Sequence, residues 1–282
     1  MSNYNSDELI HIKDGDVEYI KFKILEKYSD KLLHLITLRH GGVSSDVYKS
    51  LNFRAAGNDD VNNVLKNLDI VSKKIGINSS DVFKGKQDHT DNIVIIDNEN
   101  KEQYRFSNFS KDKIDGYIVK DKNINTLVTT ADCNPIIIYD PIQNIVANVH
   151  SGWKGTLARI SLKAAKIMNE KFNSNFEDLI VCIGPSIRKC CFTSKEEEFK
   201  EKFTNVFPDE NSYITKDEDG TYHFDLIQVI SNDLVNIGVK KGNIKVADIC
   251  TACNENDFYS YRKAKQRKDK DYATFATIVG IK

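Results

Sequence analysis

Apolar runs rich in β-branched residues recur along the chain, and turn residues bound each of them. Such runs predict β-strands, and the lack of polar alternation in several of them is typical of strands buried on both faces. The predicted strands are residues 32–38, 93–96, 124–129, 136–139, 145–150, 179–183, 244–249 and 275–281. We therefore expect a protein built around sheets whose strands are largely buried.

Between these runs, apolar residues recur at the three- and four-residue spacing of amphipathic helices. Residues 61–75 show this pattern, with Asn58 or Asp59 as the expected N-cap and Gly76 as the stop. The other expected helices are residues 157–172, a segment whose capping box is Ser194 with Glu197, and residues 226–237 ended by Gly238. Because no linker or internal repeat interrupts the alternation of strands and helices, we predict one α/β domain over residues 1–282.

Composition narrows the class of protein. With 282 residues, of which 40% are hydrophobic, the chain can bury a full core. Lys and Arg number 40 against 41 Asp and Glu, so the basic excess of a dedicated nucleic-acid binder is missing. The N-terminus lacks the pattern of a signal peptide, and no run approaches the roughly 18 apolar residues that span a bilayer. We expect a cytoplasmic protein without nucleic-acid or membrane partners, while its oligomeric state stays open.

Six cysteines are spread along the chain, and Cys190 and Cys191 are adjacent. A chain of this length needs no disulfide framework, so we expect reduced thiols. Cys250 and Cys253 have the C-x-x-C spacing of redox and metal sites, but they lack the second pair that a zinc ribbon requires. We interpret both pairs as structural.

Two polar islands flank the apolar run 136–149 and are the strongest candidates for chemistry. They read Thr130-Ala131-Asp132-Cys133-Asn134-Pro135 and His150-Ser151-Gly152-Trp153-Lys154-Gly155. A thiol and an imidazole at the two ends of buried strands suggest a reactive pair, although a core Cys is usually an inert small hydrophobe. The turn from Gly152 to Gly155 starts a predicted helix, whose N-terminus favours an anion; a tight glycine corner explains the same turn.

A third island, Lys86-Gln87-Asp88-His89-Thr90-Asp91, precedes the predicted strand 93–96. His89, Cys133 and His150 then offer two imidazoles and a thiolate, each at a strand boundary. Three such ligands and a water are the pattern of a catalytic zinc, whereas structural zinc sites fill all four positions with protein. Their spacing matches no compact finger motif, so the residues alone do not single out this set.

Two arginines are candidates for binding an anion. Arg39 follows a predicted strand in Arg39-His40-Gly41-Gly42-Val43-Ser44, and its guanidinium suits phosphate. A structural hairpin with a solvated Arg explains this segment equally well. Arg262 begins a basic run that is typical of a solvated loop, yet it could reach an anionic ligand.

The order of these islands resembles the laccase-domain family of YfiH type, long labelled multicopper polyphenol oxidases and more recently understood as purine nucleoside phosphorylases. The resemblance covers nearly the whole chain. Its motifs are Thr37-Leu38-Arg39-His40-Gly41-Gly42-Val43-Ser44, Tyr48-Lys49-Ser50-Leu51-Asn52, Gln87-Asp88-His89, Asp115-Gly116, Ala131-Asp132-Cys133-Asn134-Pro135, His150-Ser151-Gly152-Trp153-Lys154-Gly155, Ile183-Gly184-Pro185-Ser186-Ile187, Cys250-Thr251 and Phe258-Tyr259-Ser260-Tyr261-Arg262.

The resemblance implies a single α/β domain with mixed sheets flanked by helices in α/β/β/α layers. It implies that His89, Cys133 and His150 hold zinc and form the catalytic centre, with Arg39 nearby. The implied substrates are phosphate and a purine nucleoside, namely adenosine, inosine, guanosine or 5'-methylthioadenosine. Adenosine deamination is also associated with the family.

Two motifs depart from the family pattern. The usual Gln-Val-His-Gly is Gln87-Asp88-His89-Thr90 here, and the Gly-Arg pair usual near the C-terminus has no clear counterpart around residues 272–276. The oxidase label conflicts with composition, because a four-copper oxidase needs roughly ten His ligands and this chain has six His in all. One copper bound by His89, Cys133 and His150 would at most give weak phenol oxidation.

Our mechanistic hypothesis is that Arg39 and the amides from Gly152 to Gly155 hold phosphate, with Arg262 as a further contact. Phosphate attacks C1' of the ribose as the purine departs. In deamination, a water activated at the metal attacks C6 of adenine. Asp115 or Asp132 would move protons or orient a metal ligand from behind.

Two other functions stay open at this stage. In a Cys-His hydrolase or deamidase, Cys133 would be the nucleophile and His150 its base. In a non-catalytic protein, the fold would serve a partner, such as a component that edits peptidoglycan synthesis. Metal content and turnover of nucleosides separate these functions from the zinc phosphorylase.

Overall fold

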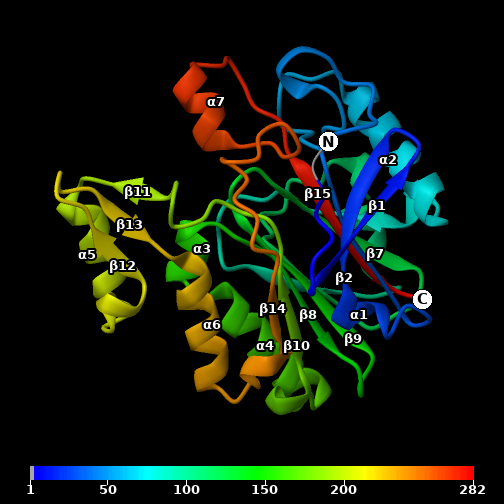
Figure 1. The fold of residues 1–282 in the computed structure, drawn as a ribbon. Coiled ribbons are helices and arrows are strands. Elements are labelled where there is room, and N and C mark those ends of the chain that lie inside the picture. Colours follow the sequence, from blue (N-terminus) through cyan, green and yellow to red (C-terminus); the bar gives the residue numbers. More distant parts are fainter. Residues whose placement is uncertain (1–2) are drawn as a thin grey trace.

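The computed structural model describes residues 3–282 (Figure 1). Its strands are β1 Leu9–Asp14, β2 Val17–Phe22, β3 Leu32–Thr37, β4 Val82–Phe83, β5 Ile93–Ile96, β6 Gly116–Val119, β7 Ile124–Thr130, β8 Asn134–Asp140, β9 Ile145–Ser151, β10 Ile180–Ile183, β11 Thr193–Ser194, β12 Ile214–Lys216, β13 Tyr222–Phe224, β14 Ile244–Val246 and β15 Phe275–Ile281. Its helices are α1 Lys23–Glu26, α2 Val61–Ile75, α3 Trp153–Leu157, α4 Ile160–Phe172, α5 Glu197–Thr204, α6 Leu226–Asn236 and α7 Tyr261–Arg267.

Two mixed six-stranded sheets form the centre of the molecule. The first has the order β1-β2-β3-β15-β7-β4, and only its β7–β4 pair is parallel. The second has the order β14-β10-β8-β9-β6-β5, and its outer pairs β14–β10 and β6–β5 are parallel. The chain crosses from the first sheet to the second between β7 and β8, where Cys133 lies.

Strand β8 shows why the two sheets stack. Ile137 and Tyr139 point into the core between the sheets, while Ile136 and Ile138 face the opposite way and pack with α4 and α6. Each fully buried side chain of this kind stabilises the fold by roughly 1.5–3 kcal/mol. On the far face of the first sheet, α2 packs through apolar residues that include Leu68. The layers therefore follow the expected α/β/β/α order.

Helix α2 begins and ends close to the prediction. The expected N-cap, Asn58 or Asp59, is wrong by one or two residues, because the side chain of Asp60 accepts from the backbone N–H of Asn62. Asp59 instead accepts hydrogen bonds from Ser44 and Asn52. Gly76 ends the helix, as expected, with a left-handed φ of 72°.

The helix expected over residues 157–172 is interrupted. Arg159 has a φ of 54°, which separates α3 from α4, and its guanidinium donates to the carbonyl of Val206. The expected capping box of Ser194 and Glu197 does not form, since Glu197 hydrogen-bonds to Tyr222. Helix α5 starts at Glu197 without a side-chain cap.

A small third sheet of order β11-β13-β12 packs with α5 around an aromatic cluster that includes Phe203 and Phe224. Figure 1 shows this unit projecting from one side of the stacked sheets, beside α3 and α6. No helix in residues 3–282 is both long and apolar enough to cross a membrane.

Candidate functional site

Three potential ligands meet where the ends of several strands lie together. His89 comes from the connection between β4 and β5, Cys133 from the crossing between β7 and β8, and His150 from the end of β9. The pairing of Pro135 with His150 brings the second and third ligands together on neighbouring strands. Residues separated by up to 61 positions in the chain therefore share one site.

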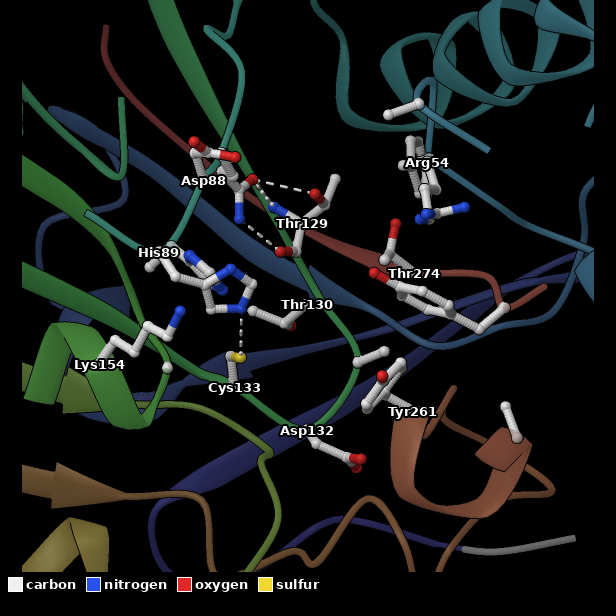
Figure 2. A pocket seen from close by; sticks show the side chains of 18 of the residues that line it. Arg54, Asp88, His89, Thr129, Thr130, Asp132, Cys133, Lys154, Tyr261 and Thr274 are labelled. Atoms are coloured by element: carbon white, nitrogen blue, oxygen red, sulfur yellow. Dashed lines mark hydrogen bonds between the residues drawn. The ribbon is translucent and has the colours of Figure 1, made fainter. Parts of the chain in front are cut away.

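The spacing of the three ligand atoms fits a metal ion. Nε2 of His89 lies 3.7 Å from Sγ of Cys133, and the ligand atoms of all three residues lie within 4.8 Å of one another. A tetrahedral zinc would separate a nitrogen and a sulfur ligand by about 3.6 Å, given its usual bond lengths. Figure 2 shows the His89 imidazole directed at the Cys133 thiol. The donor set thus suits a metal cofactor, with one position left for a non-protein ligand.

Asp115 ties two of these ligands together from behind. Its Oδ1 lies 2.8 Å from Nδ1 of His150 and accepts from the backbone N–H of His89 at 3.2 Å. The backbone N–H and hydroxyl of Thr90 donate to Oδ2, each at 2.7 Å. Burial by itself would raise the pKa of Asp115, but the hydrogen bonds from His150 and Thr90 bring it to about 2. The carboxylate stays ionised and fixes the His150 ring with Nε2 free to bind a metal.

Gly152 allows the chain to pass close to the ligands. A Cβ at this position would lie 2.7 Å from Cδ2 of His89 and 3.0 Å from Sγ of Cys133. Any side chain here would displace a ligand, so the close approach requires glycine. The same packing partly covers the Cys133 thiol.

Burial shapes the protonation of the ligands. It lowers the pKa of His89, whose ring is crowded by protein although one edge faces the cavity, and so keeps the imidazole neutral. It raises the pKa of the Cys133 thiol to about 12, and the negative charges of Asp132 and Asp115 act in the same direction. Without a metal, Cys133 is therefore a protonated thiol and a poor nucleophile. A bound metal would favour the thiolate.

The three ligands lie in a cavity of about 1090 Å³ at the edge of the stacked sheets. Eight Lys or Arg and four Asp side chains line it, so the cavity favours anions. Lys154 extends toward the ligands in Figure 2 and also lies 5.6 Å from the ring centre of Trp153. The aromatic lining residues are Phe53, Phe106, Phe109, Trp153, Phe192, Phe199, Tyr261 and Tyr272.

Lys84, another of the lysines on the cavity wall, differs from the rest in its pKa. Burial lowers its pKa to about 8, against the attraction of Asp115, and Nζ donates to the carbonyl of Gly85. Its charge thus titrates much nearer neutrality than that of an ordinary lysine.

The family description "Multi-copper polyphenol oxidoreductase laccase" matches residues 33–282. The chain belongs to this family. Its structure resembles that of the YfiH protein of Bacillus licheniformis, with a TM-score of 0.87 and 25% identity over 96% of this chain and 99% of that one.

Several relatives of this chain are named as purine nucleoside phosphorylases, and another is named as an adenosine deaminase. A purine nucleoside phosphorylase of Bacteroides thetaiotaomicron is 28% identical, covering 88% of this chain and 92% of that protein. A purine nucleoside phosphorylase of Clostridium acetobutylicum is 32% identical, covering 86% and 91%. Adenosine deaminase RL5, from an unknown prokaryotic organism, is 27% identical, covering 77% and 83%. These relatives support an enzyme of this family.

Two residues expected at this laccase-family site lie elsewhere. Arg39 is not among the residues that line the large cavity, because its guanidinium donates to the backbone carbonyls of Lys49 and Glu255 and stacks on Tyr259. Gly155 lies inside the short helix α3, buried against β9 and outside the cavity wall. Neither residue lines the large cavity, so their expected contact with phosphate stays a prediction.

Asp132 is close to the ligands in sequence but turned away from them. It has a left-handed φ of 88°, and its carboxylate accepts from the hydroxyls of Thr251 and Ser260 and from the backbone N–H of Arg262. Asp132 thus holds the crossing that presents Cys133, and the expectation that it moves protons at the metal has no support in these contacts. Arg262 lines the cavity, with its guanidinium anchored on the carbonyl of Cys191.

Two positioning residues were not foreseen. The side-chain amide of Gln87 pairs with the backbone of Thr129, donating to its carbonyl and accepting from its N–H, both at 2.7 Å. Thr90 adds a hydroxyl hydrogen bond to Asp115 that a glycine could not make. The signals in the sequence were their place within two residues of His89 and, for Gln87, its family motif; their partners Thr129 and Asp115 are distant in sequence.

Proposed function

We propose that this chain is a zinc-dependent purine nucleoside phosphorylase. The observation that carries the proposal is the arrangement of His89, Cys133 and His150, oriented by Asp115, on the wall of a cationic and aromatic cavity. The two relatives named purine nucleoside phosphorylase support the same reaction. Adenosine, inosine, guanosine and 5'-methylthioadenosine are the proposed nucleosides, with phosphate as the second substrate.

The donor set favours zinc over a multicopper centre. Two neutral imidazoles and one thiolate with an open fourth position are typical of catalytic zinc, and six His in the chain are too few for four coppers. A zinc ion held there would supply Lewis-acid polarisation of a bound polar atom. Copper remains the alternative metal, and weak phenol oxidation in copper-loaded protein would report it.

The reaction needs an anion and a purine held side by side. A phosphate oxygen forms a bond to C1' while the bond from C1' to the purine nitrogen breaks, and the purine leaves with that electron pair and takes up a proton. In our proposal Lys154 and Arg262 hold the phosphate, and aromatic side chains such as Trp153 and Tyr261 contact the base. Lys84, whose pKa of about 8 allows exchange near neutrality, is the proposed proton source.

Adenosine deamination is the second candidate activity. The relative named adenosine deaminase RL5 favours it, and an open metal position suits activation of water. A Cys-His hydrolase with Cys133 as nucleophile is disfavoured, because burial raises the pKa of the thiol to about 12. We further infer one domain over residues 1–282 acting in the cytoplasm.

Chromatography of products from zinc-loaded protein and adenosine tests the proposal. Adenine formed only with phosphate reports phosphorolysis, inosine reports deamination, and hypoxanthine reports both in sequence. Zinc-loaded protein that turns over none of the four nucleosides would contradict the proposal. Iodoacetamide labelling of Cys133 in metal-free native protein that retains amidase activity would favour the hydrolase instead.

A further inference from the structure

Four of the remaining five cysteines form a second cluster, away from the cavity ligands. Cys190 and Cys191 follow β10, and Cys250 and Cys253 follow β14. Their four sulfur atoms lie within 4.8 Å of one another. The sequence-based interpretation that Cys250 and Cys253 lack a second pair is therefore wrong, since the adjacent cysteines supply it.

The distances between the sulfur atoms indicate what the cluster binds. Cys190 and Cys191 each lie near Cys253, at 3.7 and 3.5 Å, and the two adjacent sulfurs are 3.8 Å apart. Four thiolates around a tetrahedral zinc would be separated by about 3.8 Å, given a Zn–S bond of about 2.3 Å. A disulfide requires about 2.05 Å, and an iron–sulfur cluster places several atoms between its cysteines.

The backbone around Cys250 is built for a thiolate. The amides of Arg188 and Cys253 hydrogen-bond to its sulfur. The two loops are joined beside it by a parallel bridge between Ser186 and Cys250. Because amide donors stabilise a charged sulfur, these contacts preorganise the cluster for metal binding.

The positively charged side chain of Arg188 lies near the cluster. The buried guanidinium of Arg188 is held by the carbonyl of Gly184 and the hydroxyl of Ser186, and it attracts the sulfurs of Cys190 and Cys250. A zinc with four thiolates carries a net charge of about −2, so a nearby fixed cation lowers the cost of assembling it.

We propose that Cys190, Cys191, Cys250 and Cys253 bind a structural Zn²⁺ distinct from the metal in the cavity. All four positions are filled by protein thiolates, which leaves no site for substrate or water. Binding joins the loop after β10 to the loop after β14. The inference goes beyond the proposed function and does not depend on it.

The structural zinc would support the cavity through short connections. The backbone N–H of Ile187 donates to the carbonyl of Asp132 at 2.8 Å, and the hydroxyl of Thr251 donates to the Asp132 carboxylate at 2.7 Å. The carbonyl of Cys191 accepts from Arg262. Both loops joined by the metal thus touch the residue that precedes the cavity ligand Cys133.

Zinc analysis of the purified full chain, expressed with zinc and kept free of chelators, tests this site. We expect about two zinc ions per chain for the wild type and about one for Cys133→Ala and for the Cys190→Ser/Cys253→Ser double variant. Cys182→Ala, which changes the one cysteine outside both clusters, should keep about two. A wild type with about one zinc that disappears in Cys133→Ala would overturn the proposal.

Alkylation of the wild type gives an answer that does not require a folded variant. Cys190 and Cys253 are exposed, so iodoacetamide should label them readily if they are free thiols. With zinc bound, peptide mapping should show both unlabelled until a chelator is added. Labelling before chelation, or a disulfide between them in freshly purified protein, would contradict the zinc site. Neither result depends on nucleoside turnover.

Discussion

The two clusters that contain thiols have similar distances between their ligand atoms, but they differ in the number of protein ligands. In the cavity, Nε2 of His89 lies 3.7 Å from Sγ of Cys133, and the loop cluster holds the same separation between Cys190 and Cys253. The cavity cluster has three protein ligands and faces a large cavity, whereas the loop cluster has four and joins two loops. In our proposals, ligand number and surroundings, more than ligand spacing, distinguish the site for chemistry from the site for stability.

Removal of the cavity thiol should have the largest effect on turnover. We expect Cys133→Ala to lose phosphate-dependent release of adenine by on the order of 10³-fold or more, because two imidazoles alone no longer hold the metal tightly. The measurement is initial rate by chromatography at saturating phosphate, with zinc content determined on the same sample. Cys182→Ala is the matched control and should retain wild-type rates. Full activity in Cys133→Ala would show that the reaction does not require the metal site.

Asp115 should be next in effect, since it acts through the ligands. Asp115→Asn keeps the size of the side chain but loses the charge that orients His150. We therefore expect zinc affinity or activity to fall by roughly 10- to 100-fold. Competition with a zinc-binding dye measures the affinity. Asp91→Asn is the control, because Asp91 lies in the same island and its carboxylate pairs with Lys163, away from the proposed ligands. Equal zinc affinity in both variants would show that Asp115 is not a positioning residue.

Lys154 tests the anion-binding role of the cavity. Lys154 and Lys202 both lie near the ring of Trp153, at 5.6 and 5.9 Å, but only Lys154 lines the cavity. We expect Lys154→Ala to raise the KM for phosphate by about tenfold, the effect of losing about 1.4 kcal/mol of binding, with zinc content unchanged. Lys202→Ala should leave this KM at the wild-type value. A similar KM for phosphate in both variants would show that Lys154 does not bind the phosphate.

The sequence predicted the residues of the cavity cluster better than their surroundings. His89, Cys133 and His150 each stand beside a recognisable strand, and the structure brings them together. Arg39 looked equally suitable for phosphate, but the carbonyl of Glu255, 216 positions away, takes up its guanidinium. A local motif cannot reveal such a partner, because it comes from a distant loop. The resemblance to a family was needed to select these three residues among the many possible sets of His and Cys.

The sequence did not predict strands that are buried on one face only or that are very short. Strand β1 reads Leu-Ile-His-Ile-Lys-Asp and mixes polar with apolar residues, because it lies at the edge of its sheet. Strand β6 has four residues, one of them glycine, and is recognisable only through its pairing with β9 and β5. The second thiol cluster was missed for a related reason. Its two pairs lie about 60 residues apart in sequence and meet only because β10 and β14 are parallel neighbours.

The loop cluster should have the smallest effect on turnover and a clear effect on stability. We expect Cys253→Ser to lower the Tm by about 10 °C, since loss of roughly 3 kcal/mol shifts the Tm of a domain of this size by about 3 °C per kcal/mol. At 20 °C its kcat should stay within about threefold of wild type, because the cluster reaches the cavity ligands through intervening residues such as Asp132 and Arg262. Differential scanning calorimetry and initial rates measure the two effects.

Cys253→His, which keeps a zinc ligand, should recover most of the Tm. If Cys253→Ser instead melted like the wild type and lost turnover as fully as Cys133→Ala, the assignment of one cluster to chemistry and the other to stability would have to be reversed.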